Sequence, residues 1–120
     1  MTKPADAVTI YHNPGCGTSR NVLAAIREAG HAPTVVEYLK TGWTRPQLDA
    51  ILKAMKARPR DILRVRGTPA AELGLDQPSA TDEAILSAMV ANPVLVERPI
   101  VTSPKGAALC RPAERVADLL

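Results

Sequence analysis

Residues 11–21 read YHNPGCGTSRN and place a single cysteine, Cys16, in a glycine-rich turn between two regular elements. Residues 7–12 (AVTIYH) are short, β-branched and aromatic and stop at an Asn-Pro pair, which predicts a strand. Residues 17–30 (GTSRNVLAAIREAG) carry apolar side chains at helical spacing and end on Gly30, which predicts a helix. We therefore expect Cys16 in a strand–turn–helix unit, at the positive end of the helix.

The rest of the chain predicts an α/β layer fold with a mixed sheet. The expected elements are a strand at 34–39, a helix at 44–56 capped by Thr44 with Pro46 in its first turn, short helical segments at 60–65 and 68–74, a helix at 81–92 capped by Thr81, strands at 94–101 and 107–110, and a last helix at 111–120. This order, with no linker or repeat, predicts one domain over residues 1–120, with a helical insertion at about residues 44–92 after the second strand.

Composition excludes several classes of protein. Of the 120 residues, 46% are hydrophobic and 22% are charged, as in a globular domain, and aliphatic side chains must fill the core because Phe is absent. No apolar run approaches the ~18 residues of a membrane span, and the first residues lack the apolar core of a signal peptide, so we expect a cytoplasmic protein. A net charge of +3 and 2% aromatics do not favour nucleic acid. No exposed apolar helix stands out, and we expect a monomer.

The two cysteines differ in their sequence context. With two histidines they form neither a disulfide framework nor a zinc-ligand pattern, so no metal is expected. Cys110 ends an apolar strand-like run, which favours a structural role. A glycine-rich turn does not place Cys16 in the core, which favours a functional thiol there. The position three residues on is Ser19, so Cys-x-x-Ser replaces the Cys-x-x-Cys of a dithiol site and Ser19 cannot resolve a disulfide.

A helix terminus alone activates such a thiol only partly. A free cysteine has a pKa of ~8.5, and a helix N-terminus contributes ~0.3–1 and at best ~2 kcal/mol, which lowers the pKa by about 1. A cation about 4 Å away contributes on the order of 4 kcal/mol at an effective dielectric constant of about 20. Cys16 is therefore expected to need a cationic neighbour, either His12 or arginines from elsewhere in the chain.

The whole chain resembles the glutaredoxin-coupled arsenate reductases, the ArsC family of thioredoxin-like proteins. The matching segments are YHNPGCGTSRN at residues 11–21, ILR at 62–64, ELGL at 72–75, ERPIV at 97–101 and LCRP at 109–112. They occur in the order and at the spacing of that family over about 110 residues. The resemblance implies a thioredoxin-like sheet with flanking helices and a cis peptide bond between Arg98 and Pro99.

The resemblance also implies a role for each matched residue. Cys16 is the nucleophile; Arg64, Arg98 and Arg111 bind the substrate oxyanion together with Gly17 and Thr18 in the first helical turn; His12 and Ser19 tune the thiolate. Arginine suits a tetrahedral oxyanion because it stays charged and donates two parallel hydrogen bonds.

The implied reaction is reduction of arsenate to arsenite by covalent catalysis, with no bound cofactor. Cys16 forms an adduct with arsenate, glutathione attacks as co-substrate because no resolving cysteine stands beside Cys16, and glutaredoxin completes the reduction. Two alternatives remain at this point. A glutathione-dependent thiol or disulfide reductase needs Cys16 but not three arginines, and an Spx-like regulator binds RNA polymerase without catalysis.

Overall fold

The computed structural model describes residues 8–120, which form two compact units. The first unit joins the described residues up to Thr41 to Arg98–Leu120, and the second unit is Gly42–Glu97. The expected insertion at residues 44–92 lies within the second unit. Residue 7 of the first expected strand lies outside the described residues.

The first unit is built on a four-stranded mixed sheet. Its strands are β1 (Thr9–His12), β2 (Thr34–Glu37), β3 (Ile100–Ser103) and β4 (Gly106–Leu109), in the order β2-β1-β3-β4. β1 pairs in parallel with β2 and antiparallel with β3, and β3 pairs antiparallel with β4. Ile10 stands opposite Val35 on one side and Val101 on the other. This arrangement confirms the predicted α/β class and the mixed sheet.

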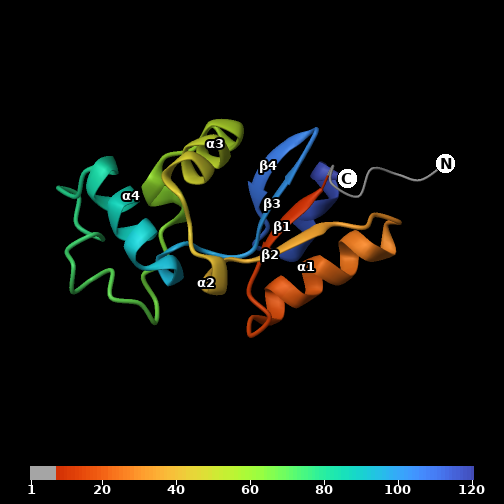
Figure 1. Ribbon diagram of the computed structural model, residues 1–120, viewed down its shortest axis with the longest axis horizontal. Helices are drawn as coiled ribbons and strands as arrows, with labels where there is room; N and C mark the ends of the chain where they lie inside the picture. Colours follow the sequence, from red (N-terminus) through yellow and green to blue (C-terminus); the bar gives the residue numbers. More distant parts are fainter. Residues whose placement is uncertain (1–7) are drawn as a thin grey trace. The chain divides into compact units, whose positions relative to one another are not determined.

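Helix α1 (Gly17–Glu28) and the 3-10 segment η4 (Ala113–Leu119) contact each other, and α1 runs beside the strands in Figure 1. The core between them consists of Val8, Ile10, Val22, Ile26, Val101, Cys110, Val116 and Leu119. Burial of each large aliphatic side chain contributes about 1.5–3 kcal/mol. The helix ends as predicted, because Gly30 follows it with a φ of 89°, a left-handed conformation that glycine adopts without strain.

The second unit contains α3 (Arg45–Met55), η2 (Pro59–Ile62), α4 (Asp82–Ala91) and η3 (Pro93–Leu95). The predicted caps of both α-helices are present. Thr44 accepts a hydrogen bond from the Gln47 N–H while the Gln47 side chain accepts one from the Thr44 N–H, and Thr81 accepts from the Ala84 N–H. Arg45 and Glu83 form an ion pair between α3 and α4.

The second strand is shorter than expected. It ends at Glu37, and residues Tyr38–Thr41 form a short helix, α2, where a strand over residues 34–39 was predicted. The reason lies in the neighbouring strand. The last paired residues are His12 and Glu37, and beyond His12 the chain turns at Asn13 and Pro14, so no ladder partner continues past Glu37.

Two predicted segments next to prolines also differ. Residues 60–65 were expected to be helical, but η2 ends at Ile62 and Leu63 forms an isolated antiparallel bridge with Val96. Residues 94–101 were expected to be one strand, but η3 occupies the start and β3 begins only at Ile100. Pro93 and Pro99 lack the N–H groups that a continuous ladder requires. The final segment, predicted as a helix, is the 3-10 helix η4.

Both arginine–proline bonds of interest are cis. The expected cis bond at Arg98–Pro99 is present, and Arg111–Pro112 is a second one. Within residues 8–120, none of the helices has the length and apolar character needed to cross a membrane.

Candidate active site

Cys16 is the N-cap residue of α1, at the turn that follows β1. Its N–H donates to the Asn13 carbonyl at 3.0 Å, and its own carbonyl accepts from the Arg20 N–H at 3.0 Å, which is the first bond of the helix. The Asn13 side chain accepts from the Gly15 N–H at 2.9 Å. Asn13 therefore shapes the turn, a role the sequence analysis did not assign, although an Asn-Pro-Gly run is a known turn signal.

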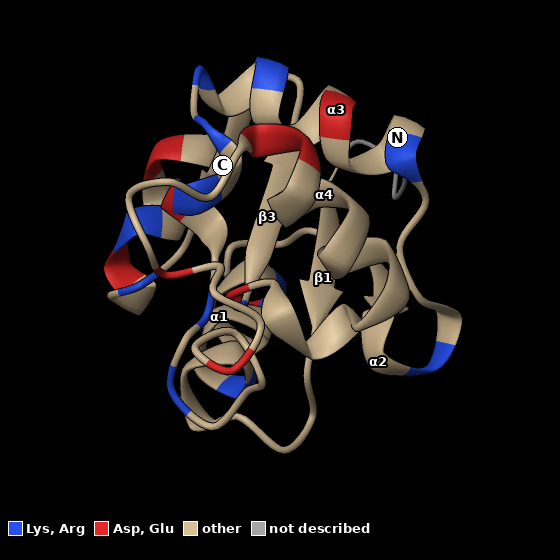
Figure 2. Ribbon diagram, turned by 90° about the vertical axis from the view of Figure 1, so that its left-hand side faces the viewer, with Lys and Arg blue, Asp and Glu red and all other residues tan. Residues whose placement is uncertain are grey.

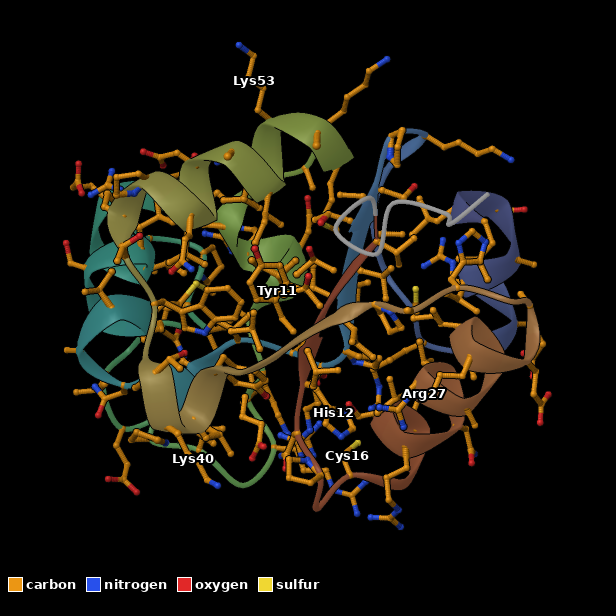
Figure 3. The ribbon with its side chains drawn as sticks, turned by 45° about the vertical axis from the view of Figure 1, so that its right-hand side comes forward. Tyr11, His12, Cys16, Arg27, Lys40 and Lys53 are labelled. Atoms are coloured by element: carbon orange, nitrogen blue, oxygen red, sulfur yellow. The ribbon has the colours of Figure 1, made fainter. Side chains whose placement is uncertain are left out.

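His12 and Ser19 form a buried pair behind this turn. The Ser19 Oγ lies 2.6 Å from the Nδ1 of His12 and accepts from the Asn13 N–H at 3.1 Å. Both side chains are buried. Figure 3 shows His12 and Cys16 close together where β1 leads into α1, with Arg27 further along the helix. The Ser19 hydroxyl thus ties the end of the strand to the first turn of the helix.

Arg98 lies just before β3 and Arg111 just after β4, and the guanidinium groups of both act on the Cys16 thiol. The pairing of Ile100 with Leu109 places the residues just outside the two strands side by side, and the Cys110 N–H donates to the Pro99 carbonyl at 2.9 Å. The Nη1 of Arg111 lies 3.7 Å from the Cys16 sulfur and donates to the Arg98 carbonyl at 3.0 Å. Strands β1 and β3 contain no Lys, Arg, Asp or Glu and are therefore tan in Figure 2. The two guanidinium groups come from the segments that flank β3 and β4.

The surroundings of Cys16 lower the pKa of its thiol to about 7. Partial burial acts in the opposite direction and raises the pKa, but it is outweighed by the backbone N–H of Ser19 and by the guanidinium groups of Arg98 and Arg111. About half of the thiol is therefore ionised at neutral pH. This is the state that a nucleophilic cysteine requires.

The positive charge at Cys16 comes from arginine and not from histidine. Burial lowers the pKa of His12, with Glu37 acting against the shift and Arg27 and Arg20 adding to it. This shift favours the neutral imidazole. Of the two sources of positive charge considered from the sequence, the arginines fit, whereas His12 contacts Ser19.

Cys110 has the properties of a structural cysteine. Its side chain is fully buried in the core beneath α1 and η4, and burial raises its pKa to about 11. Its thiol is 3.8 Å from the Ala108 carbonyl. Such a thiol stays protonated at neutral pH and is a poor nucleophile.

The remaining predicted residues lie at two places. Gly17 is exposed and Thr18 is half-buried, both in the first turn of α1 beside Cys16. Arg64 belongs to the second unit, where its Nη1 donates to the Glu97 carboxylate at 2.8 Å. Glu97 was not singled out from the sequence.

Within the part of the chain that the structure describes, no three His, Cys, Asp or Glu side chains gather as metal ligands would.

The mixed sheet, the helix that starts at a single activated cysteine and the cis-proline segment beside it define a thioredoxin-like protein with a one-cysteine site. The solved arsenate reductase from Vibrio cholerae superposes with a TM-score of 0.89 at 36% identity, over 94% of this chain and 97% of that one. A putative arsenate reductase from Yersinia pestis gives a TM-score of 0.86 at 38% identity, over 92% and 98% of the two chains.

Sequence comparison narrows this class to one family. The ArsC family model matches residues 11–119. The chain is 57% identical to arsenate reductase ArsI2 of Synechocystis sp. and 56% identical to the arsenate reductase of Rhizobium meliloti, in each case over 94% of this chain and 81% of the relative. The chain belongs to the ArsC family.

Proposed function

We propose that this ArsC-family protein is an arsenate reductase in which Cys16 attacks arsenate and glutathione and glutaredoxin supply the electrons. The observation that carries the proposal is the thiol of Cys16, which has a pKa of about 7 and lies 3.7 Å from the Nη1 of Arg111. A thiolate next to a guanidinium group is suited to attack an anion, because the arginine both activates the sulfur and attracts the substrate.

Several hydrogen-bond donors belong to the segments around the Cys16 sulfur and support this proposal. The Nε of Arg98 is buried and has no hydrogen-bond partner among residues 8–120, so a bound oxyanion would satisfy it. Arg111 is already at the thiol, and the N–H groups of Gly17 and Thr18 belong to the first turn of α1, where helix N–H groups lack partners within the helix. Arg64 matches an oxyanion-binding arginine of the family motif, and we propose the same role for it.

The reaction then proceeds in four steps. The Cys16 thiolate forms an S–As bond, and one arsenate oxygen leaves as water after protonation. Glutathione replaces a second oxygen, which also leaves as water, and becomes bonded to arsenic through sulfur. A glutaredoxin thiolate attacks the glutathione sulfur, so the S–As electron pair returns to arsenic and As(V) becomes As(III). Water releases arsenite and regenerates Cys16. One glutathione–glutaredoxin disulfide accounts for the two electrons.

The resolving thiol comes from outside the chain in this scheme. Ser19 occupies the position where a dithiol site has its second cysteine, and its hydroxyl is engaged with His12. Cys110 is buried, with its pKa raised to about 11. We expect the protein to work as a monomer in the cytoplasm, where glutathione and glutaredoxin are kept reduced.

The test is arsenate reduction by the purified protein with glutathione and glutaredoxin, compared with the same assay with thioredoxin. We expect turnover only with the first pair, its abolition by Cys16→Ser and its retention by the matched variant Cys110→Ser. Loss of turnover in Cys110→Ser, with the fold intact, would contradict an external resolving thiol.

A second variant separates this function from general thiol exchange on the same scaffold. Arg98→Ala removes a guanidinium group that arsenate binding is expected to require and that supplies only part of the stabilisation of the Cys16 thiolate. Arsenate turnover is expected to collapse while reduction of a glutathione mixed disulfide persists. Equal loss of both activities would favour the thiol–disulfide reductase, and absence of both in the unaltered protein would favour a non-catalytic regulator.

A further inference from the structure

Arg64 is held by two hydrogen bonds within the second unit. Its Nη1 donates to the Oε1 of Glu97 at 2.8 Å, and its Nε donates to the Arg66 carbonyl at 3.1 Å. The side chains of Arg64 and Glu97 are only 17% and 24% exposed. Such shielding distinguishes this pair from the other ion pairs of the unit, which lie on the surface.

The backbone on both sides of this pair is also fixed. The Arg64 N–H donates to the Leu95 carbonyl and the Glu97 N–H donates to the Ile62 carbonyl, each at 2.8 Å. The Thr68 hydroxyl donates to the Arg64 carbonyl at 2.7 Å. Because both main chains are anchored, little further entropy is lost when the two side chains meet, in contrast to a pair of free surface side chains.

These bonds determine how Arg64 can hold an anion. A guanidinium group binds an oxyanion through two neighbouring N–H groups on one of its edges. These edges are the Nη1–Nη2 edge and the Nε–Nη2 edge. Nη1 is bound to Glu97 and Nε to the Arg66 carbonyl, while Nη2 has no partner among the described residues. Each edge that could bind an oxyanion with two hydrogen bonds therefore includes one nitrogen that already donates to another group, and on the Nη1–Nη2 edge that group is the Glu97 carboxylate.

We propose that Glu97 is a positioning residue that orients Arg64 and competes with the substrate oxyanion for it. This inference rests on the proposed function, in which Arg64 binds arsenate. On the Nη1–Nη2 edge, a tetrahedral anion either displaces the Glu97 carboxylate or binds beside it through the second N–H of Nη1, where the carboxylate charge repels it. Glu97 thereby sets the affinity of the site for tetrahedral dianions as a class.

The test is Glu97→Gln, which keeps an oxygen acceptor for Nη1 and removes the negative charge. We expect the KM for arsenate to fall about three- to tenfold while kcat changes less than about twofold. Inorganic phosphate, which is not reduced, serves as the second probe. The phosphate concentration that half-protects Cys16 from iodoacetamide is expected to fall by the same factor.

Two further variants establish that the effect acts through Arg64. Glu83→Gln removes the same charge from an exposed ion pair in the same unit and is expected to leave KM and phosphate protection unchanged. In an Arg64→Gln background, Glu97→Gln is expected to have no effect, because the residue it releases is gone. A purely structural role of Glu97 would show as a lower stability with no gain in affinity.

Several results would overturn the proposal: unchanged or weaker phosphate protection in Glu97→Gln, an equal gain in Glu83→Gln, or a gain that persists without Arg64. Absence of phosphate protection in both the unaltered and the Glu97→Gln protein would also overturn it. If the unaltered protein does not reduce arsenate, the proposed function fails, and the phosphate measurement still decides the role of Glu97.

Discussion

The Nη1 atom of Arg111 lies 3.7 Å from the sulfur of Cys16, although 95 positions separate the two residues in the sequence. The antiparallel pairing of β3 with β4 brings Arg111 beside Arg98, whose carbonyl orients the same Nη1 at 3.0 Å. The helix terminus alone would lower the thiol pKa by about 1. The arginines supply the additional stabilisation of the thiolate that the helix terminus alone does not provide.

The first prediction concerns the pH dependence of Cys16 alkylation. With a pKa of about 7 in place of the ~8.5 of a free cysteine, about half of the thiol is ionised at pH 7 in place of about 3%. Because a thiolate of lower pKa is a weaker nucleophile, this gain of about 16-fold is reduced to about threefold in rate.

The iodoacetamide rate is therefore expected to rise with pH, with a midpoint near 7, and to level off above about pH 8, since only the thiolate reacts. The measurement is made in the Cys110→Ser protein, so that Cys16 is the only thiol. A midpoint at or above that of a free cysteine would contradict the described environment.

The second prediction concerns the charge of Arg111. Arg111→Gln is expected to move the alkylation midpoint up by about 1 and to lower kcat/KM for arsenate at least about 100-fold, because thiolate and substrate both lose a cationic partner. Arg111→Lys keeps the charge without the planar fork and is expected to shift the midpoint less. Arg115→Gln, an exposed matched control, is expected to change neither value. An unshifted midpoint in Arg111→Gln would refute the role of Arg111 in activation.

The fold was predictable where local sequence decides the structure. Thr44 and Thr81 cap their helices through bonds to residues three positions on, so the sequence motif contains both partners. The end of β2 at Glu37 was missed, because it depends on where the neighbouring strand stops. The bridge between Leu63 and Val96 was missed for a related reason, since each residue takes its conformation from a distant partner.

The candidate site likewise combines features that local sequence determines with features that depend on distant residues. The strand–turn–helix motif was sufficient to place Cys16 at the start of a helix, and the match to the family motifs selected Arg98 and Arg111. The lowered pKa of His12 was not predictable, since it depends mainly on burial. The pairing of Arg64 with Glu97 joins residues 33 positions apart, and neither residue alone carries a signal for it.

The third prediction concerns the capping box of α3. Thr44→Ala removes the acceptor of the Gln47 N–H and is expected to lower the free energy of unfolding by about 1 kcal/mol, as measured by urea denaturation. Thr44→Ser keeps the hydroxyl and is expected to recover most of that loss. The alkylation midpoint of Cys16 should stay the same in both variants. Equal destabilisation by Ala and Ser would show that the hydroxyl does not carry the effect.

The fourth prediction separates the Ser19 hydroxyl from the Ser19 backbone. Ser19→Ala leaves the Nδ1 of His12 and the N–H of Asn13 without their shared partner in a buried place, which is expected to cost about 1–3 kcal/mol of unfolding free energy. Thr18→Ala removes a neighbouring hydroxyl for which residues 8–120 provide no hydrogen bond, and it serves as the control for stability.

The same variant should leave the Cys16 thiol activated, because the group that lowers its pKa is the backbone N–H of Ser19 and not the side chain. We expect the alkylation midpoint of Ser19→Ala to remain near 7, well below that of Arg111→Gln. A midpoint raised as far as in Arg111→Gln would mean that the hydroxyl and His12 act on the thiolate directly. In that case the buried pair would belong to the activation of Cys16, and its role would extend beyond holding the turn.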